Sequence, residues 1–378
     1  MVDFPRAAYI HLPFCRHHCC YCDYPVIARR DDLIPAFVEA LDVELSWLEE
    51  PRPVDTLYLG GGTPTQLPVE DLQHVIESAQ YWFLLQPGYE FTLEANPVDL
   101  TGEVLSSLVR WGVTRVVLGV QSFHHDTLAL LERDHDAEGI RAACELLQSA
   151  GIEISLDLMF AVPGQTIEQW QEDLEKIVEL GPHHLSILGL TIEPGTALHT
   201  RVIAGELLEV NEDLQRSMYI AAIDRLERAG YEHYEISNFS QPGCRSRQNQ
   251  AYWDGSGYFA AGPGATRLVN GRRETNYRDT IAYLQKVQSG ISPVDETEQL
   301  SLEMSARERL VFGLCQLEGI QAESFHVETG YSVSQLMGAC LAEFESGGFL
   351  AWDQKTLQLT RKGLLVSDSL WPSLLQPV

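Results

Sequence analysis

The chain has 378 residues, enough for two or three domains with a buried core. Its formal net charge of −28 excludes a nucleic-acid partner, because binding phosphates requires a positive surface. No apolar run reaches the roughly 18 residues that span a bilayer, and the first residues lack the pattern of an export signal. We therefore expect a cytoplasmic protein whose acidity serves solubility. Peripheral membrane contact and the oligomeric state stay open.

The first 240 residues alternate short apolar runs with amphipathic helical patterns. The runs predict strands at 7–12, 56–59, 90–93, 115–120, 153–159 and 184–190. Apolar residues at three- and four-residue spacing predict helices at 33–49, 69–79, 103–111, 137–150 and 167–180. Strand–helix repetition makes a parallel sheet. Six units are too few for a full eight-stranded barrel, so we expect an α/β fold with a partial (β/α)6 barrel.

Polar or glycine-rich residues follow each predicted strand. The first strand leads into a cysteine loop, and the second leads into a Gly-Gly-Gly-Thr-Pro-Thr segment at 60–65. The next three strands end at or carry Glu94 with Asn96, Gln121 with Ser122, and Asp157, and the sixth leads into 191–196. The carboxyl ends of parallel strands form the functional face of α/β barrels, so we expect the site there.

The pattern changes after a predicted helix at 212–229. A last strand is expected at 234–239, followed by a segment rich in glycine and aromatic residues at 243–264. Predicted helices at 300–317 and 332–346 precede two apolar runs at 349–352 and 357–360, which suggest a two-stranded wing. We predict a barrel over 1–240, an aromatic and arginine-rich connecting region over 241–299, and a small α+β, winged-helix-like domain over 300–378.

The cysteine loop carries the first chemical signal. Cys15, Cys19 and Cys22 are spaced C-x3-C-x2-C, and three thiolates on a short loop can each bind one iron of a [4Fe–4S] cubane. The fourth iron then stays open for S-adenosylmethionine (SAM). The alternative is a structural zinc site, which needs four closed ligands and could recruit His17, His18 or Cys20. Cys20 is expected to be a bystander, since adjacent residues cannot easily reach one compact cluster.

The glycine segment at 60–65 favours the cluster. Glycines let the backbone approach a ligand closely and present N–H groups without a side chain in the way. Alone, such a run is typical of any strand-to-helix turn. In the unit that follows a C-x3-C-x2-C loop, it indicates a SAM site.

The chain resembles the radical-SAM family of oxygen-independent coproporphyrinogen III oxidases, which includes a heme chaperone branch. The matching segments run nearly end to end. They include 9–15, 60–65, 93–97, 119–123, 155–159, 163–166, 190–196 and 234–239. The resemblance implies that a set of side chains and glycines binds SAM: Tyr9, Tyr21, Gly61, Gly62, Thr63, Glu94, Gln121, Arg133 and Asp157. Arg133 can pair with the SAM carboxylate, and the carboxylates can accept hydrogen bonds from SAM.

Two departures from the oxidases favour the chaperone branch. Tyr24 stands where the oxidases carry a fourth cysteine, and only eight residues precede Tyr9, where the oxidases carry a longer segment. The resemblance then implies a protein that binds heme and delivers it to a heme-accepting protein. The alternative is an oxidase that decarboxylates propionates with a deoxyadenosyl radical.

Heme binding is a further expectation that the chaperone branch implies. The chaperones carry a His-Asn-x-x-Tyr-Trp motif, and here Gln248 replaces the histidine while Asn249, Tyr252 and Trp253 match. Glutamine is a poor iron ligand, so either Tyr252 or Cys244 ligates heme instead, or the tetrapyrrole binds at this site without an axial bond. Arginines of the connecting region could pair with the propionates of heme: Arg245, Arg247, Arg267, Arg272, Arg273 and Arg278. Alternatively they offset the acidic surface.

Overall fold

The computed structural model describes residues 5–376. Over these residues the largest sheet has nine strands in the order β11-β1-β4-β5-β6-β7-β8-β10-β9. Its parallel body consists of β1 (Ala7–Leu12), β4 (Arg52–Gly61), β5 (Phe83–Ala95), β6 (Arg115–Gln121), β7 (Glu153–Phe160) and β8 (His184–Gly189). The predicted α/β fold with six parallel strands in sequence order is confirmed.

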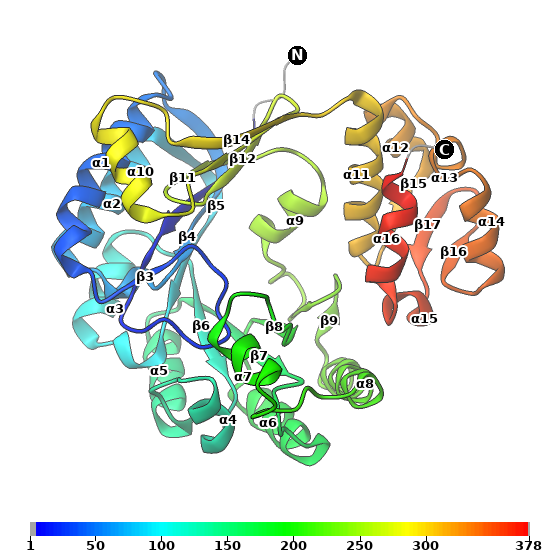
Figure 1. Ribbon diagram of the computed structural model, residues 1–378, viewed down its shortest axis with the longest axis horizontal. Coiled ribbons are helices and arrows are strands. Elements are labelled where there is room, and N and C mark those ends of the chain that lie inside the picture. Colours follow the sequence, from blue (N-terminus) through cyan, green and yellow to red (C-terminus); the bar gives the residue numbers. More distant parts are fainter. Residues whose placement is uncertain (1–4, 377–378) are drawn as a thin grey trace.

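Helices connect these strands and cover the outside of the curved sheet (Figure 1). They are α1 (Ile34–Ser46), α2 (Val69–Trp82), α3 (Gly102–Arg110), α4 (His125–Leu130), α5 (Ala137–Ser149) and α6 (Ile167–Leu180), with α7 (Ala197–Ile203) and α8 (Glu212–Arg228) after the last parallel strand. Short 3-10 turns precede α1, α2 and α3: η1 (Asp31–Leu33), η2 (Pro64–Gln66) and η3 (Pro97–Asp99).

Local sequence explains where these helices begin and end. Thr166 caps α6 in a reciprocal pair with Gln169, which satisfies two of the free N–H groups of the first turn. Gly181 ends α6 in the left-handed conformation. The face of α6 toward the sheet is apolar at helical spacing, with Trp170, Leu174 and Ile177 buried.

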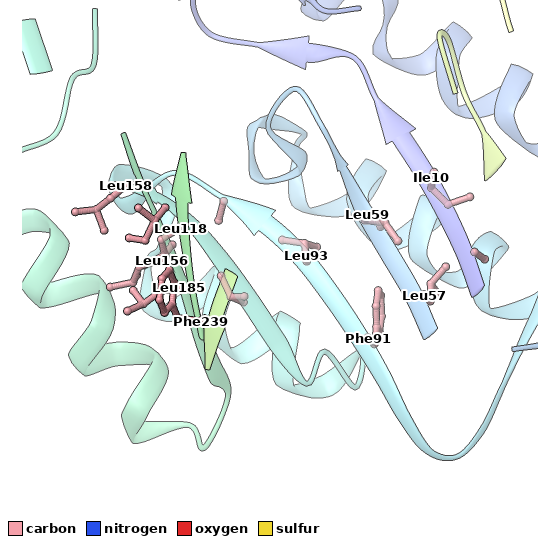
Figure 2. Packing of buried hydrophobic residues seen from close by; sticks show 14 of the residues in the cluster. Ile10, Leu57, Leu59, Phe91, Leu93, Leu118, Leu156, Leu158, Leu185 and Phe239 are labelled. Carbon is pink, nitrogen blue, oxygen red and sulfur yellow. The ribbon is translucent and has the colours of Figure 1, made fainter. Parts of the chain in front are cut away.

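The core lies between the sheet and its helices (Figure 2). Neighbouring strands contribute fully buried side chains, among them Ile10, Leu57, Leu59, Phe91, Leu93, Leu118, Leu156, Leu158, Leu185 and Phe239. Burial of each such side chain stabilises the fold by about 1.5–3 kcal/mol. The rigid sheet therefore fixes the positions of the residues at its strand ends.

The edges of the sheet differ from the predicted pattern. The strand expected at 234–239 is wrong for its first four residues, because β10 (Asn238–Ser240) begins only at Asn238 and runs antiparallel to β8. Glu235 accepts a hydrogen bond from the backbone N–H of Ser237, which bends the chain before β10. β9 (Glu232–His233) pairs with β10 at this edge. At the opposite edge, β11 (Phe259–Ala261) runs parallel to β1.

The predicted connecting region is more regular than its composition suggests. It contains α9 (Arg247–Trp253), β11 and α10 (Thr280–Gln288), and an antiparallel sheet of β12 (Thr266–Val269), β13 (Arg272–Asn276) and β14 (Val294–Gln299). Because β11 extends the main sheet, this region is joined to the barrel. The domain division at 240 and 300 stays a prediction.

The C-terminal module lies beside the barrel, with α9 between them (Figure 1). Its helices are α11 (Leu302–Cys315), α12 (Ala322–Thr329), α13 (Val333–Met337), α14 (Ala339–Ser346), α15 (Arg361–Leu364) and α16 (Ser367–Leu375). Gly338, which is not helical, splits the helix predicted at 332–346 into α13 and α14. The wing contains β16 (Leu350–Trp352) and β17 (Thr356–Leu359) as predicted, and also β15 (Ile320–Gln321), which the prediction missed.

No helix within residues 5–376 is both long enough and apolar enough to cross a membrane.

Candidate functional site

A cavity of about 360 Å³ opens at the carboxyl ends of the parallel strands. Its lining gathers nearly all the predicted site residues: Cys15, Cys19, Tyr21, Cys22, Gly61, Gly62, Thr63, Glu94, Gln121, Arg133 and Asp157. They come from the loop after β1 and from the ends of β4, β5, β6 and β7, together with the segment after α4. Tyr9 is absent from this lining, although its strand leads to the cysteine loop.

The cysteine loop is held against the glycine segment by backbone hydrogen bonds. β2 (Phe14–Cys15) pairs with β3 (Ile27–Ala28), which closes the loop at its base. The backbone N–H of Gly62 donates to the carbonyl of Leu12 (2.8 Å), and that of Thr63 donates to the carbonyl of Phe14 (2.8 Å). A Cβ on Gly62 would lie 2.5 Å from the Phe14 oxygen and 3.0 Å from Cys15 Sγ. Only glycine allows this close approach.

Cys20 is separated from the other cysteines of the loop. Its thiol donates to the carbonyl of Leu130 (3.2 Å), and its side chain packs in a small apolar cluster with Leu131 and Leu198. Burial raises the pKa of the Cys20 thiol to about 11. Cys20 does not line the cavity, in agreement with the expectation that it is a bystander.

The zinc alternative lacks a compact set of ligands. Among the residues that the structure describes, no three His, Cys, Asp or Glu side chains converge in a way that could hold a single metal ion. A cubane does not require its ligands to converge on one point, because each thiolate binds a different iron. Three cysteine thiols that line one cavity are the set of ligands that a cubane needs.

Two buried carboxylates lie deeper in the site. The Tyr58 hydroxyl donates to Glu94 Oε1 (2.6 Å), and the backbone N–H of Gly61 donates to Glu94 Oε2 (3.1 Å). Burial, with a smaller contribution from the Asp157 charge, raises the pKa of Glu94 to about 7. Burial also raises the pKa of Asp157 to about 6, against the opposing effects of a Ser186 hydrogen bond and the Arg133 charge.

Arg133 links the cysteine loop to the strand ends. Its guanidinium donates to the Gly119 carbonyl (2.8 Å) and to the Asn96 side chain, and it lies 3.8 Å from Cys19 Sγ. The Asn96 amide in turn donates to the Thr63 hydroxyl (3.3 Å). This arrangement places one positive charge beside the thiols and above the two carboxylates.

Three buried polar atoms at this cavity have no hydrogen-bond partner: Gln121 Oε1, Arg133 Nε and Asp157 Oδ1. Such atoms normally cost about 1–3 kcal/mol each unless a ligand or water satisfies them. Gln121 also adopts a left-handed backbone conformation (φ 65°) at a bulge in β6, a strained geometry that is common at binding sites. Unpaired acceptors, an unpaired guanidinium N–H and the close glycine backbone fit a ligand with amino, carboxylate and hydroxyl groups, as SAM has.

Tyr9 supports the site indirectly, through a contact with His11. The Tyr9 hydroxyl is 2.9 Å from His11 Nδ1, and His11 Nε2 is 3.0 Å from the carbonyl of Pro25, just beyond the cysteine loop. Burial lowers the pKa of His11 to about 4, so this ring is neutral at pH 7.

Tyr58 and Asn96 hold site residues in place but lie outside the predicted set of binding residues. In the sequence, Asn96 follows a predicted strand, and Tyr58 lies two residues before the glycine segment.

The arginines of the connecting region are not free in the structure. Each arginine of the predicted cluster contacts an acidic side chain or a carbonyl: Arg245 with Glu232 and Glu318, Arg247 with Gly88, Arg267 and Arg272 with Glu274, Arg273 with Glu298 and Glu308, and Arg278 with Asp23. These contacts favour the alternative in which the arginines offset acidic neighbours.

Gln248 is buried on the inner side of α9. It is 1% exposed, accepts a hydrogen bond from the Thr56 hydroxyl (2.5 Å) and donates one to the Tyr252 hydroxyl (2.8 Å). Tyr252 and Tyr258 line a separate cavity of about 270 Å³ between α9 and α11, together with Phe312 and Arg273. Position 248 therefore does not face an open surface.

Comparisons with known proteins agree with this geometry. The family model of the Radical SAM superfamily matches residues 9–177, and that of the HemN C-terminal domain matches residues 300–366. In the solved structure of coproporphyrinogen III oxidase (HemN) from Escherichia coli, the same fold recurs with a TM-score of 0.88. That match has 22% identity and covers 99% of this chain and 91% of the other. Membership in the radical-SAM superfamily implies a [4Fe–4S] cluster and SAM.

Curated relatives match from end to end. The protein named heme chaperone HemW from Lactococcus lactis subsp. lactis is 34% identical over 376 residues, covering 99% of this chain and 98% of the relative. Those of the same name from Bacillus subtilis and Mycobacterium tuberculosis are 30% and 31% identical, covering 98% of this chain and 99% and 95% of their own lengths. The chain therefore belongs to the radical-SAM family whose members include the proteins named heme chaperone HemW.

Proposed function

We propose that this protein is a radical-SAM heme chaperone, which binds heme and passes it to a heme-accepting protein. The observation that carries this function is the similarity, at 30–34% identity over nearly the whole chain, to several relatives named heme chaperone. The strand-end cavity supplies the chemical part, because it brings three thiols and unsatisfied polar atoms together.

In this proposal Cys15, Cys19 and Cys22 hold the cluster. Their thiols line one cavity, and Cys20 points into an apolar cluster instead. When bound and reduced, the cluster supplies the electron that can cleave the sulfonium bond of SAM. The Arg133 guanidinium beside Cys19 stabilises negative charge on the thiolates at this position.

The remaining lining residues bind SAM. Arg133 Nε is free to donate to the SAM carboxylate, and Asp157 Oδ1 and Gln121 Oε1 are free to accept from its amino or hydroxyl groups. Glu94 is held by Tyr58 and Gly61 and accepts further hydrogen bonds at its remaining lone pairs. Tyr21 and Thr63 close the cavity beside the cysteine loop, and Gly61 and Gly62 leave room for the ligand. Tyr9 acts through His11 as a positioning residue.

The alternative function is oxygen-independent coproporphyrinogen III oxidation. The structural likeness to the oxidase shows the fold alone. Tyr24, where the oxidases carry a fourth cysteine, lines the cavity of this protein and is 65% exposed. A tyrosine at this point does not supply the thiol that the oxidases carry there, which favours the chaperone.

Anaerobic reconstitution followed by two parallel assays tests the function. Titration with hemin should give saturable binding, and incubation with coproporphyrinogen III, SAM and a reductant should give no protoporphyrinogen. Turnover of the porphyrinogen would assign the protein to the oxidases instead.

Cysteine variants test the cluster in the same preparation. Alanine at position 15, 19 or 22 should remove the visible absorbance of the cluster and about four irons per chain, the stoichiometry of a cubane. Cys20→Ala is the matched control and should keep both. Stoichiometric zinc without iron in the reconstituted wild type would contradict the proposal.

A further inference from the structure

This inference rests on the function proposed above, in which the cargo is heme. The iron of that heme needs a ligand from the protein. The cavity of about 360 Å³ is near the lower end of the roughly 300–1,000 Å³ found for pockets of small ligands, and in the proposed function SAM and the cluster occupy it. The tetrapyrrole therefore needs a place outside it. The cavity beside α9 has about 270 Å³, and another of about 550 Å³ is lined by Gly243, Arg245 and Arg247. Neither offers an imidazole, because the sequence from Gly243 to Arg278 contains no histidine.

The cysteine loop carries two histidines at the mouth of the cavity. His17 and His18 both line it, and both are exposed, with the side chain of His17 46% accessible. His17 Nε2 lies 2.7 Å from a Glu132 carboxylate oxygen, and His18 Nε2 lies 3.0 Å from the carbonyl oxygen of Cys22.

These contacts orient both rings. A carboxylate and a carbonyl oxygen only accept hydrogen bonds, so Nε2 is the donor in each ring, and Nδ1 takes no part in either bond. Metal-binding histidines commonly donate their second N–H to a carboxylate or a backbone carbonyl, which orients the ring and increases its basicity. His17 and His18 therefore have the hydrogen-bonding pattern of metal ligands. The proposed cluster does not use them, because the three cysteines are its ligands.

One more side chain at the same mouth suits a porphyrin. Tyr24 is 65% exposed, so its ring is available to a flat macrocycle. Arg16 on the cavity rim is paired with Asp99 (2.9 Å) and Asp134 (3.7 Å), as the arginines of the connecting region are with their neighbours.

We propose that the iron of the cargo heme is ligated at the mouth of the SAM cavity by His17 or His18, with Tyr24 against the macrocycle. This site takes the place of position 248, which is buried and occupied by hydrogen bonds. It also places the cargo directly over the cluster loop, so that SAM and cluster occupancy can affect heme binding.

Hemin titration of the reconstituted full-length protein tests the proposal. Pulsed EPR of the ferric heme complex, made with ¹⁵N-histidine-labelled protein, should show coupling to an imidazole nitrogen. The double variant His17→Gln/His18→Gln should lose this coupling and bind hemin at least about tenfold more weakly, equivalent to 1.4 kcal/mol. The single variants show which ring is the ligand.

Controls separate this site from its alternatives. His125→Gln changes a histidine on α4 whose side chain is 92% exposed and which does not line the cavity, so it should leave the spectrum unchanged. Wild-type heme without imidazole coupling overturns the proposal even if the double variant fails to fold. A spectrum that responds to Tyr252→Phe and not to the histidine variants also overturns it and places the iron beside α9. Failure of the wild type to bind hemin would instead contradict the chaperone function.

Discussion

Gly62 determines how closely the cysteine loop can approach the end of β4. The loop after β1 approaches the end of β4 so closely that a methyl group on Gly62 would lie 2.5 Å from a backbone oxygen. A backbone carbonyl within a paired strand cannot move as easily as a side chain can. The cysteine loop therefore keeps this geometry only because residue 62 has no Cβ.

Gly62→Ala should accordingly weaken SAM binding and cluster retention. Overpacking of this kind costs about 1–3 kcal/mol, which corresponds to a loss of roughly 5- to 100-fold in SAM affinity if the loop yields to relieve it. Isothermal titration and iron analysis of the reconstituted variant measure both effects. Gly102→Ala is the matched control, because nothing lies within 4 Å of the added carbon at the start of α3. Equal SAM affinity in the two variants would contradict this reading of the loop.

At the scale of elements, the main strands could be predicted because they are short, apolar and regularly separated by amphipathic helices. The shared edge of the parallel strands then predicted that Glu94, Gln121 and Asp157 would meet at one cavity, and the structure places them together. Short elements such as β11 and β15 have too few residues to show a periodicity. Their formation depends on strands distant in sequence, with which they pair.

Contacts between distant side chains could not be predicted from the sequence. The arginines of the connecting region appear as a positive patch in the sequence, but the fold brings acidic residues from other elements against them, such as Glu318 against Arg245. Likewise, nothing in the residues around Gln248 shows that Thr56 lies opposite its side chain. Such pairings depend on the packing of α9 against the barrel.

One buried carboxylate ties the connecting region to the barrel. Glu44 on α1 accepts hydrogen bonds from the backbone N–H of Gly262 (2.8 Å), the amide of Asn276 (2.6 Å) and the hydroxyl of Tyr283 (2.7 Å). Glu44→Ala would leave the donors of Gly262 and Tyr283 without a partner, whereas the Asn276 amide also donates to the Gly262 carbonyl (2.8 Å). At about 1–3 kcal/mol for each of these two donors, the free energy of unfolding should fall by at least about 2 kcal/mol. Urea unfolding measures this loss, and Glu39→Ala, an exposed position on the same helix, should change stability little. A similar midpoint for both variants would show that the bonds to Glu44 are not needed.

At the scale of the whole molecule, the junction between the barrel and the C-terminal module contains a carboxyl group that is 1% exposed, Glu235. The backbone on either side of it joins the end of α11, since the N–H of Ile236 donates to Cys315 (3.2 Å) and the N–H of Leu317 donates to Tyr234 (3.0 Å). Burial raises the pKa of Glu235 to about 7, against the hydrogen bonds donated by Ser237 and Asn238. The charge of Glu235 interacts with Tyr219, Tyr234 and Cys315, whose own pKa values burial raises, so these groups are neutral at pH 7.

The junction should therefore weaken as the pH rises from about 4.5 to about 7. In this window the folded protein holds a proton on Glu235 that the unfolded chain, with an ordinary pKa of 4.5, has released, and stability falls with pH wherever the folded state binds more protons. The difference between a pKa of 4.5 and one of about 7 corresponds to at most about 3.4 kcal/mol. Glu235→Gln removes this proton, so the wild type should lose more stability than the variant between pH 5 and pH 7.5 in urea unfolding. Glu94 and Asp157 titrate alike in both proteins and cancel in the difference. After correction for the intrinsic pH dependence of amide exchange, protection at Ile236 and Leu317 should decrease over the same range in the wild type but not in Glu235→Gln. Glu318→Gln, at an exposed position of the same junction, should behave like the wild type. Parallel pH profiles for the wild type and Glu235→Gln would show that the junction does not respond to this proton.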